Sequence, residues 1–150
     1  MPVYAECGGF LYLCRTLEYG GQSYPMSGVL PLEAKVAQRP KGLGYVHAEA
    51  VRDNPYHPLG TSLRGHEFHY SFCPGSADID PDAFCLRLHK GSGIARSREE
   101  ACPGFQGSLD GLARDNVFAS YTHIHALGAP HWAPRMVEAA RAYKARRTKA

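Results

Sequence analysis

The sequence predicts a single strand-rich α/β domain. Its 150 residues match the size of one ordinary domain. Several segments in the middle of the chain alternate apolar and polar residues as strands do, whereas helical spacing is confined to the two ends. The composition, 44% hydrophobic and 21% charged, is that of a globular protein.

The chain opens with an expected strand over residues 2–6, followed by a helix over 9–18. Apolar residues recur at helical spacing in the sequence GFLYLCRTLE. The glycine pair at 20–21 is expected to stop this helix.

Extended segments dominate the rest of the chain. Strands are expected over residues 27–37, 43–52, 61–73, 83–89 and 116–125. Residues 54–60 are a loop because of their prolines and glycine, and 90–110 are a long loop rich in Gly, Ser and charge. A helix over 130–147 has a proline near its first turn and basic residues in its last turn, which suits the helix dipole.

This distribution provides few helices to cover the faces of the sheet. A three-layer α/β sheet needs helices on both faces, and here they lie only at the chain ends. We therefore expect that an N-terminal portion of the domain precedes this segment.

Charge, hydropathy and cysteine usage exclude several classes of function. The net charge of +3 is too mild to indicate nucleic-acid binding. No apolar run approaches the roughly 20 residues of a membrane span, and no secretory signal is present. We expect a cytoplasmic protein with no nucleic-acid or membrane partner. Five irregularly spaced cysteines do not form a disulfide framework: Cys7, Cys14, Cys73, Cys85 and Cys102.

The sequence AECGG places Cys7 between an expected strand and an expected helix. This is the pattern of a nucleophile elbow, in which a sharp turn exposes the side chain and Gly8 and Gly9 relieve crowding. The helix N-terminus directs N–H groups at the sulfur, so we expect a lowered pKa for Cys7 and an oxyanion donor in the Gly8 amide. The alternative is a buried structural cysteine.

Two segments offer a base for such a thiol. GHEFHYS contains His66, Glu67 and His69, and ASYTHIH contains His123 and His125. In extended chain His123 and His125 share one face, as do Glu67 and His69, while His66 faces away. Each histidine has the alternative of a hydrogen-bonded structural role. A second alternative is a zinc site built from the four histidines, although HEFH lacks the HExxH spacing.

These three signatures occur in order along the chain and resemble the C-terminal glutamine amidotransferase domain of cobyrinic acid a,c-diamide synthases. LGYVHAE at 43–49, DGL at 110–112 and the terminal helix extend the resemblance. Relatives amidate hydrogenobyrinic acid, nickel-sirohydrochlorin and sirohaem. The resemblance implies a class I glutamine amidotransferase-like, flavodoxin-like three-layer sheet, truncated at its N-terminus.

The resemblance also implies roles for individual residues. Cys7 would attack the glutamine amide and form a glutamyl thioester, with His123 as its base and His125 as the alternative base. Usual class I members carry a His-x-Glu motif, whereas here His125 occupies the acidic position. The site would then be a Cys–His dyad, or Glu67 would orient the histidine.

By the same resemblance, residues 1–150 are a partial amidotransferase domain. The upstream strands, a glycine-rich loop that completes the oxyanion hole and an ATP-binding synthetase domain are absent, and no GxxxxGK motif followed by Ser or Thr occurs. This segment would bind no cofactor or metal, since ATP and Mg are used elsewhere in full-length relatives. Its partners would be glutamine, a synthetase domain or subunit, and a tetrapyrrole bound through that partner.

Several functional points stay open at this stage. Arg39 and residues 90–108 are expected to shape either the glutamine pocket or the contact with the partner domain. The isolated chain is expected to have little glutaminase activity, because the second oxyanion donor belongs to the upstream loop. The alternatives are a catalytically inactive remnant that serves as a binding or scaffold subunit, and another Cys–His hydrolase.

Overall fold

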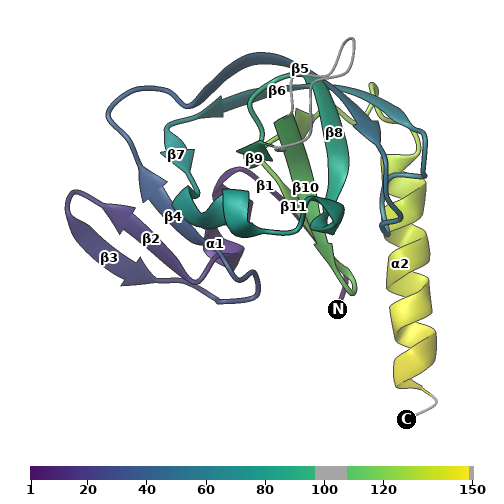
Figure 1. Cartoon of the computed structure of the whole chain (residues 1–150). Coiled ribbons are helices and arrows are strands. Elements are labelled where there is room, and N and C mark those ends of the chain that lie inside the picture. Colours follow the sequence, from purple (N-terminus) through teal and green to yellow (C-terminus); the bar gives the residue numbers. More distant parts are fainter. Residues whose placement is uncertain (97–107, 149–150) are drawn as a thin grey trace.

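The part of the chain that the structure describes forms two sheets and two α-helices (Figure 1). The computed structural model describes residues 1–96 and 108–148. The helices are α1 (Gly8–Leu13) and α2 (Trp132–Arg147), with short 3-10 helices at Pro74–Asp78 and Pro81–Ala83. The strands are β1 (Val3–Glu6), β2 (Thr16–Tyr19), β3 (Gln22–Pro25), β4 (Glu33–Val36), β5 (Gly42–Ala50), β6 (Ser62–His69), β7 (Ser71–Phe72), β8 (Phe84–Lys90), β9 (Ala95–Arg96), β10 (Ser108–Arg114), β11 (Val117–Ser120) and β12 (His123–Ile124).

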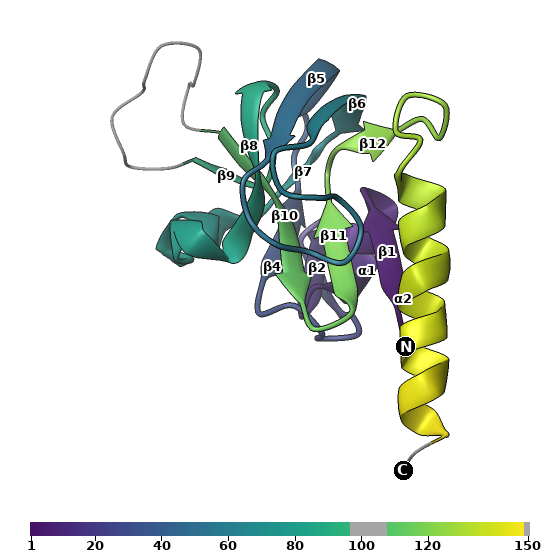
Figure 2. The same ribbon diagram turned by 90° about the vertical axis from the view of Figure 1, so that its right-hand side faces the viewer.

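The larger sheet is strongly curved. Its strand order is β1-β11-β10-β8-β5-β6-β12, with β9 paired to β10. Among the described strand pairs of this sheet, β1 and β11 run parallel and the others are antiparallel. The curvature brings β12, the last strand in this order, back beside β1, where the Ile124 amide donates to the Glu6 carboxylate at 3.1 Å (Figure 2). The ends of β1, β11 and β12 therefore meet at one edge.

The smaller sheet, of order β3-β2-β4-β7, lies to one side (Figure 1). Gly20 and Gly21 connect β2 to β3 with φ angles of 59° and 77°. Both residues of such a two-residue hairpin turn need positive φ, which glycine tolerates. The expected helix over 9–18 is therefore wrong beyond Leu13, because the glycine pair closes a hairpin and does not stop a helix.

Most of the other expected strands are confirmed, with changed bounds. The segments 43–52 and 83–89 correspond to β5 and β8. Only Glu33–Val36 of the expected strand 27–37 is extended sheet, since Pro31 has no N–H to donate and Gly28 has a φ of 70°.

Two strands fall where a long loop was expected. Strands β9 and the start of β10 lie within 90–110, and residues 97–107 lie outside the described range. The first five residues of β10 are all buried, so the strand shows no apolar–polar alternation in sequence.

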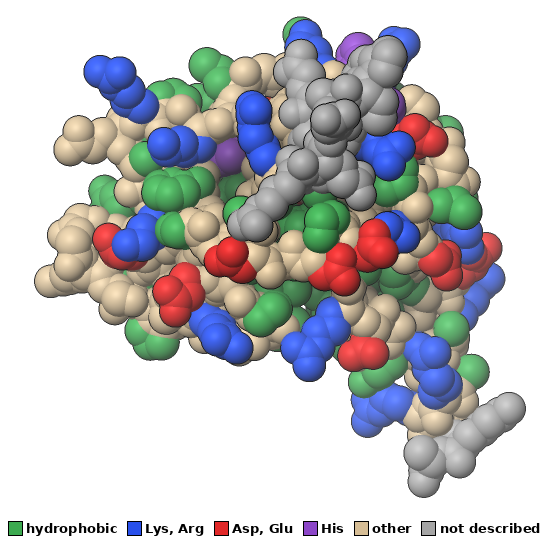
Figure 3. Space-filling model, in the orientation of Figure 1, with side chains coloured by type: hydrophobic (Ala, Val, Ile, Leu, Met, Phe, Trp, Pro, Cys, Tyr) green, Lys and Arg blue, Asp and Glu red, His purple; other side chains and the backbone are tan. Residues whose placement is uncertain are grey.

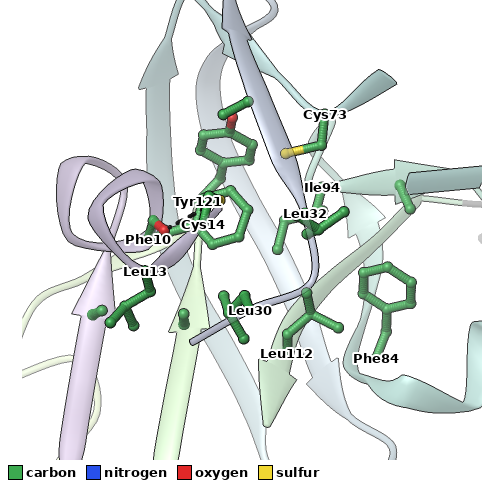
Figure 4. Packing of buried hydrophobic residues seen from close by; sticks show 14 of the residues in the cluster. Phe10, Leu13, Cys14, Leu30, Leu32, Cys73, Phe84, Ile94, Leu112 and Tyr121 are labelled. Atoms are coloured by element: carbon green, nitrogen blue, oxygen red, sulfur yellow. Dashed lines mark hydrogen bonds between the residues drawn. The ribbon is translucent and has the colours of Figure 1, made fainter. Parts of the chain in front are cut away.

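Hydrophobic clusters cover both faces of the larger sheet, which confirms the strand-rich α/β class. On one face, α1 and the smaller sheet pack around Phe10, whose ring meets Tyr121 edge-on at 4.9 Å between centroids (Figure 4). On the other face, Tyr56 and Phe118 pack with partly buried Trp132 of α2. Strand β1 alternates between the two clusters, since Tyr4 points to the second and Ala5 to the first.

Helix α2 confirms the expected C-terminal helix and stands against the second face (Figure 2). None of its described residues is buried. Lys144, Arg146 and Arg147 occupy its last turn, and Lys and Arg side chains gather along this end of the molecule (Figure 3). Neither α1 nor α2 has the length and apolar character that crossing a membrane requires.

Candidate active site

Cys7, the residue between β1 and α1, has an unusual backbone conformation. Its φ of 46° and ψ of −100° lie outside the regions allowed for L-residues. Two hydrogen bonds hold it there: the Cys7 amide donates to the Ser120 carbonyl at 2.8 Å, and the Leu11 amide donates to the Cys7 carbonyl at 3.0 Å. Strain of this kind persists where surrounding structure enforces it, often at functional sites. The expected sharp turn between strand and helix is confirmed.

The two glycines after Cys7 have different surroundings. A Cβ on Gly9 would lie 3.2 Å from the Ala5 Cβ, so glycine permits the close approach of α1 to β1. Nothing lies within 4 Å of the Cβ position at Gly8, and the Gly8 amide acts to lower the pKa of the Cys7 thiol. The space on the Cβ side of Gly8 is therefore open, and the role of its amide as an oxyanion donor stays a prediction.

The expectation of a lowered pKa for Cys7 is wrong. Burial of the half-buried thiol raises its pKa, and the negative charge of Glu6 raises it further, against the opposing effect of the Gly8 amide. The Gly8 amide at the start of helix α1 does not outweigh the burial. The thiol therefore needs a base to become a nucleophile.

His123 lies at the same edge of the sheet as Cys7. The register of β1 and β11 pairs Glu6 with Ser120, and the chain continues from Ser120 into β12. The Nδ1 atom of His123 is 3.5 Å from a Glu6 carboxylate oxygen, and its ring stacks on that of His66, with centroids 4.9 Å apart. Since Nδ1 faces Glu6, Nε2 is the nitrogen left for proton transfer.

His125, the alternative base, follows β12 in a turn. Its Nδ1 accepts from the Leu127 amide at 3.3 Å, which ties the ring to its own turn. His123 and His125 both line an open hollow of about 440 Å³, together with His66 and Arg64. The two histidines thus open onto one space, and His123 is the one that contacts a carboxylate.

Glu67 does not lie against His123, which corrects its expected orienting role. Its side chain is buried and accepts from the Ser92 amide at 2.6 Å, the Gly93 amide at 3.1 Å and His69 Nε2 at 3.3 Å. Burial would raise the pKa of Glu67, but these hydrogen bonds outweigh it and lower the pKa. The alternation along β6 explains why Glu67 does not reach His123. Glu67 and His69 point inward, while His66 is exposed.

The four histidines do not converge on a metal. His69 turns into the interior, where its ring stacks on Tyr121 at 3.6 Å. Within residues 1–96 and 108–148, no group of three or more potential His, Cys, Asp or Glu ligands is placed to hold an ion. The four described cysteines are free, and Cys102 lies outside the description.

Asp110 is a site residue that sequence reasoning missed. Its fully buried carboxylate accepts from the Tyr121 amide at 3.0 Å, the Thr122 amide at 2.9 Å and the Thr122 hydroxyl at 2.6 Å. Burial raises the pKa of Asp110, against these hydrogen bonds. The carboxylate fixes the two residues that lead into His123. The DGL motif was the available signal.

The other residues with expected roles lie apart from this constellation. Arg39 is exposed between β4 and β5, and most of the 90–108 loop lies outside the described residues. Their proposed roles in the glutamine pocket or the domain contact stay predictions.

Comparison with known proteins gives a consistent result. The profile of the CobB/CobQ-like glutamine amidotransferase domain matches residues 1–131. Cobyrinate a,c-diamide synthase of Magnetococcus marinus is 37% identical over 134 residues, which cover 89% of this chain and 26% of the relative. The synthase of Methanothermobacter thermautotrophicus is 39% identical over 132 residues, 88% of this chain and 26% of the relative. The chain thus spans about a quarter of the length of these curated relatives. It belongs to the CobB/CobQ-like glutamine amidotransferase domain family.

Proposed function

We propose that this chain hydrolyses glutamine and supplies ammonia to an ATP-dependent partner, with Cys7 as nucleophile and His123 as general base. One observation carries the proposal: the strained turn at Cys7 follows directly on Glu6, whose carboxylate contacts His123. A nucleophile on a sharp turn, a histidine at the same edge of the sheet and a carboxylate at one of its ring nitrogens match the arrangement of acyl-transfer enzymes.

The reaction follows from the groups present. His123 Nε2 takes the thiol proton of Cys7, and the sulfur attacks the amide carbon of glutamine. The carbonyl oxygen becomes an oxyanion that accepts from the Gly8 N–H. The imidazolium then protonates the leaving nitrogen, the C–N bond breaks, and ammonia leaves a glutamyl thioester. Water, deprotonated by the same histidine, hydrolyses the thioester to glutamate and restores the thiol.

The amidation itself is assigned to the partner. The matched relatives are named for the formation of a diamide of cobyrinate, and this chain spans only about a quarter of their length. The sequence contains no glycine-rich phosphate loop, and the described residues contain no cluster of ligands for Mg²⁺. Activation of a tetrapyrrole carboxylate by ATP therefore belongs to that partner, and the substrate class is a corrin or a related polycarboxylate tetrapyrrole.

A chimera tests this proposal. The aligned segment of the Methanothermobacter thermautotrophicus synthase would be replaced by this chain, and amidation of cobyrinate would be measured with glutamine and with ammonia. We expect activity with both nitrogen sources. Cys7→Ala and His123→Ala should abolish the glutamine-dependent reaction and spare the ammonia-dependent one, since ammonia bypasses the thioester. A general base contributes a factor of about 10²–10⁴.

The same assay separates the alternatives. An ammonia-dependent chimera that never uses glutamine would identify the chain as an inactive remnant. If His125→Ala causes the large loss and His123→Ala does not, the base has been assigned to the wrong histidine.

A further inference from the structure

A chain of polar contacts runs from Glu6 into the interior of the protein, away from Cys7. Tyr4 lies two residues before Glu6 on the same face of β1, and its pKa is raised by burial and by the nearby charge of Glu6. The Tyr4 hydroxyl lies 3.2 Å from Nε2 of His57. Nδ1 of His57 lies 3.0 Å from Nε2 of His131, just before α2.

We propose that Glu6 is the positioning residue that orients His123, and that Tyr4, fully buried His57 and partly buried His131 form a relay that supports the Glu6 carboxylate. The proposal rests on the proposed glutaminase function and names the third member of its site. It assigns a role to the tyrosine and glutamate of the sequence YAECGG and to the histidine of the loop NPYHPLG.

With Glu6 ionised, donor and acceptor balance assigns a direction to each contact of the proposed relay. An ionised Glu6 only accepts, so Tyr4 gives its single proton to the carboxylate. The Tyr4 oxygen then accepts from His57 Nε2–H. Because His57 is fully buried, with a pKa lowered by burial and by His131 to about 4, the ring is neutral at pH 7 and carries one N–H. Its Nδ1 therefore accepts from His131 Nε2–H.

Both oxygens of Glu6 are used at the site. One accepts from the Ile124 amide at 3.1 Å, which anchors β12, and the other lies 3.5 Å from His123 Nδ1. This contact favours the tautomer with its proton on Nδ1 and leaves the Nε2 lone pair free to deprotonate Cys7. The carboxylate also stabilises the imidazolium that forms, and such contacts commonly shorten when substrate binds.

No other carboxylate competes for this position among the described residues. Glu67 is held by Ser92, Gly93 and His69, and Asp110 by Tyr121 and Thr122. Within the described ranges, Glu6 is the one acidic side chain in ion-pair contact with His123.

The first test reads the tautomer of His123 directly and needs no turnover. Side-chain ¹⁵N shifts of the histidines would be recorded in the full chain and in Glu6→Gln. We expect His123 protonated on Nδ1 in the unaltered chain, and loss of this preference in Glu6→Gln. Glu49→Gln is the matched control. Glu49 lies 3.4 Å from His89, which makes a second carboxylate–histidine pair on other strands, β5 and β8. An Nε2–H tautomer in the unaltered chain, or an unchanged His123 in Glu6→Gln, overturns the proposal.

The second test uses the chimera described above. Glu6→Ala should lower kcat for glutamine-dependent amidation about 10²-fold, the lower end of a general-base contribution, with KM for glutamine and the ammonia-dependent rate unchanged. Glu6→Asp should restore part of kcat. Tyr4→Phe should lower kcat about 2–10-fold, as expected for loss of one hydrogen bond, whereas Tyr56→Phe should not.

The outcomes distinguish this inference from the proposed function. If the chimera uses ammonia but never glutamine, the proposed function fails, while the tautomer measurement still decides the role of Glu6. If glutamine is used and Glu6→Ala retains full kcat, or loses the ammonia-dependent rate equally, Glu6 is only a structural residue and the relay is refuted.

Discussion

Burial of His57 makes the stability of the protein depend on pH. The ring is fully buried, hydrogen-bonded to Tyr4 and His131, and packed edge-on against Phe118 at 5.1 Å. Burial, with a contribution from His131, lowers its pKa from 6.5 to about 4. Between these two values the unfolded chain binds a proton that the folded protein rejects, so stability rises with pH there.

The size of the effect follows from the pKa difference. Each pH unit corresponds to about 1.4 kcal/mol, so the drop from 6.5 to about 4 amounts to roughly 3 kcal/mol. The contribution is fully present above pH 6.5 and is lost as the pH falls toward 4. Domains of this size are stable by only about 5–15 kcal/mol, so the loss would be conspicuous.

Urea unfolding between pH 4 and pH 7.5 measures this contribution. We expect the free energy of unfolding to fall by about 3 kcal/mol more in the unaltered chain than in His57→Gln over this range. The unfolding free energy of His57→Gln still depends on pH, since the pKa values of His131 and Glu67 are also lowered. His47→Gln, at an exposed histidine, serves as the control and should match the unaltered chain. Equal pH dependence of the unfolding free energy in the unaltered chain and in His57→Gln would show that burial of His57 does not lower its pKa.

Three further predictions concern stability. Cys7→Gly should be more stable than Cys7→Ala by about 1 kcal/mol in urea unfolding, because only glycine tolerates the positive φ; equal stabilities would show that the turn is unstrained. Gly42→Ala should lower the melting temperature by the equivalent of about 1–3 kcal/mol, since its Cβ would collide with His69 Nε2 and lie 2.8 Å from Glu67; an unchanged melting temperature would contradict this packing. Asp110→Ala should cost about 3 kcal/mol in urea unfolding, because it leaves buried donors of Tyr121 and Thr122 unpaired; a loss below about 1 kcal/mol would argue against the network.

Local sequence patterns predicted the elements that depend on local chemistry. The turn at Cys7 and helix α2 follow from glycine placement and helix signals, and both are confirmed. The hairpin at Gly20–Gly21 was misread because glycine both ends helices and closes hairpins, and the choice depends on pairing with β4. Strand β10 was missed because burial on both faces removes the periodic signal.

Prediction of the candidate site from the sequence was limited in a similar way. The motifs predicted Cys7 and His123 as the reacting pair, which stays a proposal, and the carboxylate beside His123 was sought at Glu67. Sequence alternation correctly placed Glu67 and His69 on one face, yet it cannot say which face meets β12. Glu6 stands next to Cys7 in sequence and reaches His123 only because the sheet curves β12 back to β1.

The central claim is that Cys7 forms a covalent intermediate with glutamine. The most direct test is acid quenching of the chimera during turnover with isotopically labelled glutamine, followed by digestion and mass spectrometry. We expect a labelled glutamyl adduct on the peptide that contains Cys7, and none in Cys7→Ala. Release of glutamate with no adduct at Cys7, or with an adduct on another cysteine, would contradict it.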